Sequence, residues 1–183
     1  MSTERLLEQF TFHWDVHARP RLTGLTDDEY FWEPAPGSWN LRPRGTGSAP
    51  IQAGSGEMVI DFAFPEPSPA PVTTIAWRLG HLLVGVFGAR VASHFGGPSA
   101  DYDTYDYPTT ASDALARLDA VVGLWVDGVR GLDEEALRRP VGEAEGPWAA
   151  EPMITLVLHI HREAIHHLAE IALLRDLWAN GVR

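Results

Sequence analysis

The sequence contains no cysteine and no lysine among its 183 residues. Without cysteine the chain can form no disulfide, cannot bind zinc through thiolates and has no thiol nucleophile of its own. All 14 basic residues are arginines, and the 25 acidic residues bring the net charge to −11. Because an unpatterned acidic surface repels a phosphate backbone, we expect no nucleic-acid partner.

Long uncharged apolar runs are also missing. Residues 1–10 are charged and lack the apolar core of a signal peptide, and no other segment is expected to cross a bilayer. We therefore expect no membrane partner and a cytoplasmic protein. With 45% apolar residues, residues 1–183 are predicted to fold as a single domain with a sizeable core.

The clearest pattern is the run from Thr155 to Trp178, which holds four histidines and neither glycine nor proline. Apolar residues recur there about every three or four positions, which predicts a long amphipathic helix that ends near Gly181. The apolar positions are Leu156, Ile160, Ala164, Ile171, Leu174 and Trp178. A polar stripe beside them holds His159, Glu163, His166, His167 and Glu170, while His161 points away from it.

Glu163 and His167 lie one helical turn apart in this stripe, so a carboxylate oxygen and an imidazole nitrogen can converge on one metal ion. The simpler alternative is a solvated pair between Glu163 and either His166 or His167. Two ligands hold a divalent ion poorly. The metal hypothesis therefore requires a third protein ligand from elsewhere in the chain.

Three further long helices are predicted from helical periodicity and capping signals. Their bounds are Ser2 or Thr3 to about Arg19, Val72 or Thr73 to Phe95, and about Ala111 to Arg130 after a cap at Thr110 or Ser112. Short capped turns are expected within 25–32 and 132–140, and residues 141–152 form a loop. The acidic, tyrosine-rich residues 101–107 are predicted to be solvated surface.

His81 lies among apolar residues of the second helix and is the candidate for the third ligand. Gly80, Gly85 and Gly88 weaken this helix, which close helix packing or room for a ligand near His81 would justify. A hydrogen-bonded core histidine is the alternative interpretation of His81.

His13 and His17 of the first helix are also four residues apart, a second ligand spacing. A histidine beside leucine and phenylalanine on an apolar face is usually a core residue. We rank this pair below Glu163 and His167.

A proline-rich excursion is expected between the first two helices. Residues 34–71 hold 8 of the 14 prolines, which leaves no room for a long helix. Residues 57–64 could form a short strand with residues 39–42. Long connections in compact domains are often functional.

Three tryptophans are candidates for lining a pocket. Trp32 and Trp39 lie in the excursion, and Trp77 lies one turn before His81. They could bind a partly apolar ligand, or they could simply cover the core.

Three stretches together carry a family resemblance: RPRLTGLTDDEYFWEPAPGSWNLRP after the first helix, TTIAWRLGHLL at the start of the second and HIHREAIHHLAEIALLRDL in the fourth. On these stretches the chain resembles the DinB-like family of metal-binding proteins. The resemblance agrees with the helix pattern in predicting an all-α four-helix bundle, with a long irregular excursion between helices one and two.

The resemblance also implies a ligand set. In that family a histidine of the second helix and two residues one turn apart on the last helix bind a divalent metal, commonly zinc or nickel. The matching positions here are His81, Glu163 and His167. Many members have histidine where this chain has Glu163, and mycothiol-dependent maleylpyruvate isomerases resemble it in having glutamate. Such a set leaves an open position on a tetrahedral ion for water or a thiolate.

The resemblance further suggests a metal-dependent transferase with a low-molecular-weight thiol, such as mycothiol or bacillithiol, as cosubstrate. His166 or His13 would serve as catalytic base or would orient a ligand. The alternatives are a metal-dependent hydrolase and a stress-associated protein that binds a metal or small ligand without turnover. We also expect a homodimer, since apolar surface on a bundle is often buried against a second copy.

Overall fold

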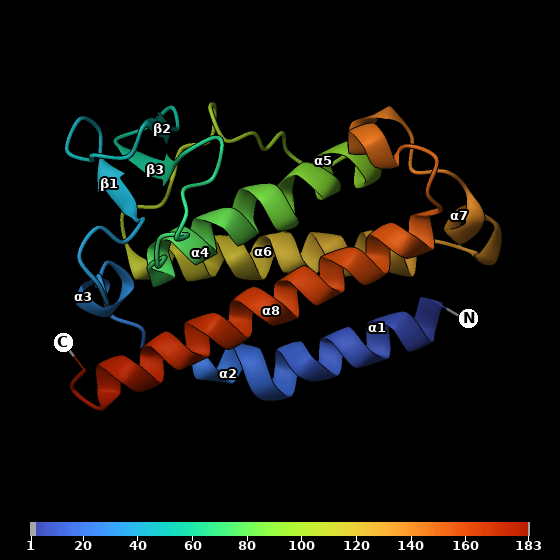
Figure 1. The fold of residues 1–183 in the computed structure, drawn as a ribbon. Helices are drawn as coiled ribbons and strands as arrows, with labels where there is room; N and C mark the ends of the chain where they lie inside the picture. Colours follow the sequence, from blue (N-terminus) through green and yellow to red (C-terminus); the bar gives the residue numbers. More distant parts are fainter. Residues whose placement is uncertain (1–2, 183) are drawn as a thin grey trace.

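The computed structural model describes residues 3–182, so Ser2, one of the two expected caps of the first helix, lies outside the described residues. Four long helical segments pack side by side (Figure 1). The first segment comprises α1 (Thr3–Phe12), the π-helical η1 (His13–Ala18) and α2 (Arg19–Arg21). The second comprises α4 (Ile75–His81), the π-helical η2 (Leu82–Val86) and α5 (Gly88–Phe95). The third and fourth are α6 (Ala111–Arg130) and α8 (Met153–Ala179).

The helices predicted from periodicity and caps are present. α6 has the predicted bounds, and Thr110 caps it by accepting a hydrogen bond from the Asp113 backbone N–H. Thr74 caps α4 in the same way, and Gly96 ends α5 in the left-handed conformation (φ 69°). The short α3 (Asp27–Tyr30) and α7 (Glu134–Arg138) are the expected capped turns, and the 3₁₀ helix η3 (Glu143–Trp148) lies in the loop before α8.

The first segment departs from the prediction in its second half. The chain stays helical through Pro20, whereas the sequence predicted an end before it. The π-helical turn adds a residue to η1 and rotates the side chains that follow. Leu6 and Phe10 are buried as expected, but His17 is exposed and Ala18 takes the buried position.

The excursion between the first two long segments contains a three-stranded antiparallel sheet, so the all-α expectation is wrong there although the protein is mostly helical. The strands lie in the order β1 (Leu41–Pro43), β3 (Met58–Phe62) and β2 (Ile51–Ala53). The predicted pairing of 39–42 with 57–64 is confirmed as β1 with β3, and β2 is additional. A buried strand such as β3 needs neighbours on both edges to satisfy its backbone groups.

The sheet packs against α4 at Gly80. A Cβ added to Gly80 would lie 3.3 Å from the Leu41 side chain and 3.4 Å from that of Ile60, so the sheet side chains pack directly on the helix backbone there. The backbone adds a second link, since the Trp39 carbonyl accepts a hydrogen bond from the Thr74 N–H at 3.0 Å. The excursion is thereby tied to the start of the second helical segment.

Buried side chains from all four long segments and from the sheet form one core cluster. His161 belongs to this core: it stacks on Phe10 at 4.4 Å and meets Trp125 edge-on at 6.1 Å. Burial lowers the pKa of His161 to about 4, so the ring is neutral near pH 7. This histidine of α8 packs the core, in agreement with its predicted direction.

The segment Ile75–Phe95 is long and apolar enough, by length and composition, to cross a membrane, contrary to the sequence-based expectation. Of the most apolar 18-residue window in this segment, 61% is buried inside the protein. The segment contacts α6, α8 and the sheet. Burial in the core therefore accounts for its apolar composition.

Candidate metal centre

α4 and α8 approach each other where His81 faces His167. The two ring centres are 4.7 Å apart and the ring planes stand at 79°. His81 is the last residue of α4, and His167 lies on the half-exposed stripe of α8 that borders its buried face. Two helical segments that are far apart in the sequence thus bring two imidazoles into contact.

His81 is held between two aromatic side chains. Trp77, one turn earlier on α4, stacks on it with 5.4 Å between the ring centres. The Tyr102 ring is nearly parallel to it, with 6.3 Å between the ring centres. The Tyr102 hydroxyl also shares a hydrogen bond of 2.5 Å with Nδ1 of His81. Burial, followed by the nearby His167 and arginines, lowers the pKa of His81 to about 3. The ring is therefore neutral near pH 7, with Nδ1 engaged by Tyr102.

Tyr102 reaches His81 because Gly85 has no side chain. A Cβ at Gly85 would lie 2.0 Å from the Tyr102 hydroxyl oxygen and 3.0 Å from the His81 ring. Of the alternatives for the helix glycines, close packing therefore explains Gly85. The prediction that residues 101–107 are solvated surface is wrong for Tyr102, which is half-buried, and for Tyr107, which is 1% exposed.

The two nitrogens of His167 have different neighbours. Nδ1 lies 3.2 Å from Oε2 of Glu170 and 3.4 Å from Nη1 of Arg78, whereas Nε2 lies 4.0 Å from Oε2 of Glu163. Burial, followed by the Arg78 charge, lowers the pKa of His167 to about 4, so this ring is also neutral near pH 7.

The gap between His167 Nε2 and Glu163 suits an ion. A separation of 4.0 Å is too long for a hydrogen bond. Zinc lies about 2.0–2.2 Å from nitrogen and oxygen ligands, so two of its ligand atoms are about 3–4 Å apart. We call His81, Glu163 and His167 the predicted cluster. His167 meets His81 ring to ring and lies 4.0 Å from Glu163, and the donor types of the three residues fit zinc or nickel.

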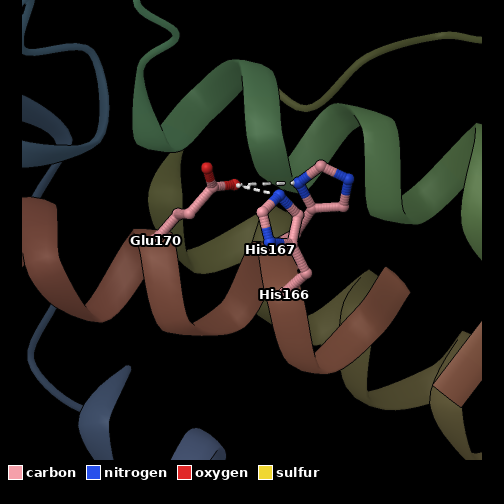
Figure 2. Close-up of side chains that lie close together, drawn as sticks. All are labelled: His166, His167 and Glu170. Carbon is pink, nitrogen blue, oxygen red and sulfur yellow. Dashed lines mark hydrogen bonds and ion pairs between the residues drawn. The ribbon is translucent and has the colours of Figure 1, made fainter. Parts of the chain in front are cut away.

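A second group overlaps with the first. His166, His167 and Glu170 each offer a ligand atom, and these atoms lie within 4.8 Å of one another (Figure 2). His166 is exposed, and its Nε2 lies 3.5 Å from Oε2 of Glu170. Sequence reasoning left open whether His166 or His167 is the ligand, but it missed Glu170 as a partner. The signal was available, since His166 and Glu170 are also four residues apart.

Arg78 distinguishes the two groups. Its guanidinium forms an ion pair with Glu170, and its side chain is only 15% exposed. A buried cation at this carboxylate opposes the binding of a second cation. The arginine beside Glu163 is Arg162, at 3.3 Å, and that side chain is 71% exposed, so solvent screens its charge. The electrostatics favour an ion beside Glu163 over one beside Glu170.

The three predicted pocket tryptophans are not together. Trp39 lies 6.0 Å from Trp77, which stacks on His81, so these two continue an aromatic row away from the cluster. Trp32 instead meets Trp178 edge-on at 5.6 Å, near the end of α8.

His13 lies on η1, where its ring centre is 6.1 Å from that of His17. Burial, and then the neighbouring His17, lowers the pKa of His13. Within residues 3–182 no hydrogen bond, ion pair or ring contact joins His13 to His81 or His167. Of the two predicted catalytic residues, only His166 adjoins the cluster.

A model of the DinB superfamily matches residues 61–171, more than half of the chain, which therefore belongs to this superfamily. The matched range contains both candidate ligand groups but not the first helical segment or the stretch 19–43 that contributed to the resemblance. No curated protein and no solved structure matches the chain significantly.

The packing of Tyr102 against Gly85 gives a stability prediction. Gly85→Ala should lower the free energy of unfolding by about 1–3 kcal/mol, because the added methyl overlaps the Tyr102 hydroxyl. Denaturant-induced unfolding measures this loss. Gly123→Ala on α6 is the matched control: no atom lies within 4 Å of its Cβ, and the substitution should stabilise by up to about 1 kcal/mol.

A double variant tests the cause of that loss. In a Tyr102→Phe background the clashing hydroxyl is gone, so Gly85→Ala should cost less than in the native chain. An equal cost in both backgrounds would show that Tyr102 does not occupy this position.

Proposed function

We propose that this protein is a metal-dependent transferase that uses a low-molecular-weight thiol of the mycothiol or bacillithiol type. His81, Glu163 and His167 bind one divalent ion, zinc or nickel, inside a four-helix bundle of the DinB type. The observation that carries the proposal is the convergence of two neutral imidazoles from different helices beside one carboxylate.

Two neighbouring groups orient the ligands. In the tautomers that metal binding requires, His81 Nδ1 donates its proton to the Tyr102 hydroxyl and His167 Nδ1 donates its proton to the Glu170 carboxylate, across contacts of 2.5 Å and 3.2 Å. Each contact leaves the Nε2 lone pair of its histidine available to the ion. Arg78 forms an ion pair with Glu170, so this carboxylate orients His167 and does not itself bind the metal ion.

The thiol must come from a small molecule, because the chain has no cysteine. When bound, a divalent ion lowers the pKa of a coordinated thiol or water, which supplies a nucleophile near neutral pH. His166 is exposed beside His167, and its imidazole can accept the proton that the thiol loses. Trp77 shields one side of the centre from water.

The proposed ligands predict one divalent ion per chain, measured by elemental analysis and by zinc and nickel titration of metal-free protein. His81→Ala and His167→Ala should each weaken metal binding by roughly 100-fold or more. Loss of a residue that only hydrogen-bonds to a ligand typically weakens metal binding by about 10- to 100-fold. His17→Ala, at an exposed position, is the control.

The same titration separates the alternative sites. His166→Ala should have a small effect. Loss of binding in His166→Ala with full binding in His81→Ala would assign the ion to His166, His167 and Glu170. Loss in His13→Ala would place it on η1.

Activity should require the metal and an external thiol together. A panel of electrophiles and esters, assayed with and without thiol and with and without metal, is the test. Turnover that needs metal but is indifferent to thiol would indicate a hydrolase. Absence of turnover across the panel would indicate a metal- or ligand-binding protein without catalysis.

We also propose a homodimer, formed through outward apolar side chains of α8. Ile165 and Leu173 are 38% and 59% exposed, and such a face is commonly covered by a second copy. Sedimentation at micromolar concentrations should give a dimer mass that Ile165→Arg reduces to a monomer. Leu124→Arg on α6, at a 44% exposed leucine, is the matched control. A monomer in the native chain would end this proposal. A cytoplasmic location stays a prediction.

A further inference from the structure

A cavity of about 530 Å³ lies between α5, η3 and the first half of α8. It is at the end of α8 that packs against α7 (Figure 1). Its volume falls within the roughly 300–1,000 Å³ of small-molecule binding sites. None of the sequence motifs pointed to this cavity.

The cavity adjoins the candidate metal centre from two sides. On α8, Nδ1 of the lining residue His159 lies 3.6 Å from Oε1 of Glu163. On α5, the lining residue Arg90 donates a hydrogen bond to the carbonyl oxygen of Gly85, the residue against which Tyr102 packs. A molecule in the cavity is therefore separated from Glu163 by the lining side chains His159 and Arg162.

The wall formed by η3 is held in place by a buried carboxylate. The Glu145 side chain is 6% exposed and accepts hydrogen bonds from Arg90 at 3.1 Å and from His94 at 2.9 Å. Its negative charge is compensated by Arg90, so Glu145 offers no free charge to a ligand. These two contacts hold η3, which includes Trp148, against α5.

The cavity presents apolar surface in an exposed position. Trp148 is 68% exposed and Leu158 is 48% exposed, and both line the cavity together with the buried Val141 and Leu156. An exposed tryptophan beside aliphatic side chains offers a platform for a flat apolar group.

The polar side of the cavity carries hydrogen-bond donors on α8, beside the exposed carboxylate of Glu151. Thr155, His159 and Arg162 follow one another at intervals of four and three residues, so they share one face of α8. In the described part of the chain, the Thr155 hydroxyl, His159 Nε2 and Arg162 Nη1 make no hydrogen bond. A carboxylate accepts hydrogen bonds from both a hydroxyl and a guanidinium, so these two donors on one face of α8 suit such a group.

We propose that this cavity binds an organic acid with a flat apolar body. The body packs on Trp148, and the carboxylate accepts hydrogen bonds from Arg162 and Thr155. Binding itself needs only the cavity. We further assign this acid as the electrophilic substrate of the transferase. That assignment rests on the proposed function, because it depends on an ion beside Glu163.

Titration calorimetry with naphthalene-2-carboxylate, on full-length protein kept metal-free with a chelator, tests the binding. A ligand of this size should bind in the millimolar range. The neutral analogue naphthalene-2-carboxamide should bind about tenfold more weakly, since it lacks the charge that Arg162 recognises. A cationic analogue, 2-naphthylmethylamine, should not bind better than the amide.

Two variants locate the site. Arg162→Gln and Trp148→Ala should each weaken naphthoate binding about tenfold. Both side chains are exposed, so neither substitution should affect folding. Arg138→Gln on α7 is the matched control, because Arg138 is 73% exposed and also paired with a glutamate. It should leave the affinity unchanged.

Three results would overturn the inference: no binding, equal binding of acid and amide, or wild-type affinity in both Arg162→Gln and Trp148→Ala. Binding that needs added zinc and disappears in His167→Ala but not in Arg162→Gln would also overturn it while leaving the metal centre intact. Metal-independent binding through Arg162 and Trp148 in a protein that takes up no metal would support the cavity and refute the proposed function.

Discussion

Close packing around the His81 imidazole links the parts of this structure. Trp77 of the same helix and Tyr102 of the loop after α5 hold the ring, and it faces His167 of α8. The arrangement depends on Gly85, since any side chain there would displace the Tyr102 hydroxyl. The same burial removes water from His81 and keeps it neutral. Only a neutral imidazole has the lone pair that a metal ion requires.

The two carboxylates beside His167 have different environments although they occupy equivalent positions on α8. Arg78 reaches Glu170 from α4 and forms a largely buried ion pair with it, so the charge of Glu170 is satisfied within the protein. The cation beside Glu163 is Arg162, which is 71% exposed, so the charge of Glu163 is less well compensated. The Arg78 ion pair is thus the difference that leads us to propose Glu163 as an ion ligand and Glu170 as the carboxylate that orients His167.

The proline-rich excursion contributes to this centre through its polar contacts. Asp61 of β3 is 2% exposed and accepts hydrogen bonds from the Asn40 N–H and the Arg42 guanidinium. Its backbone carbonyl accepts a hydrogen bond of 2.7 Å from the indole N–H of Trp77. Because Trp77 stacks on His81, the sheet helps to fix the orientation of the His81 ring. This connection between the excursion and the centre runs through residues that are far apart in the sequence.

The sequence by itself determined the elements whose signals are local. Apolar periodicity and Thr110 defined α6, and the four-residue spacing placed Glu163 and His167 on one stripe, because both depend only on helix geometry. Tertiary structure decided which partners these side chains meet. Tyr102 contacts His81, Arg78 forms an ion pair with Glu170, and β2 pairs with β3. No repeat or regular spacing in the sequence relates the residues that meet in these contacts. Such contacts arise only when packing brings distant segments together, and periodicity along one segment carries no information about them.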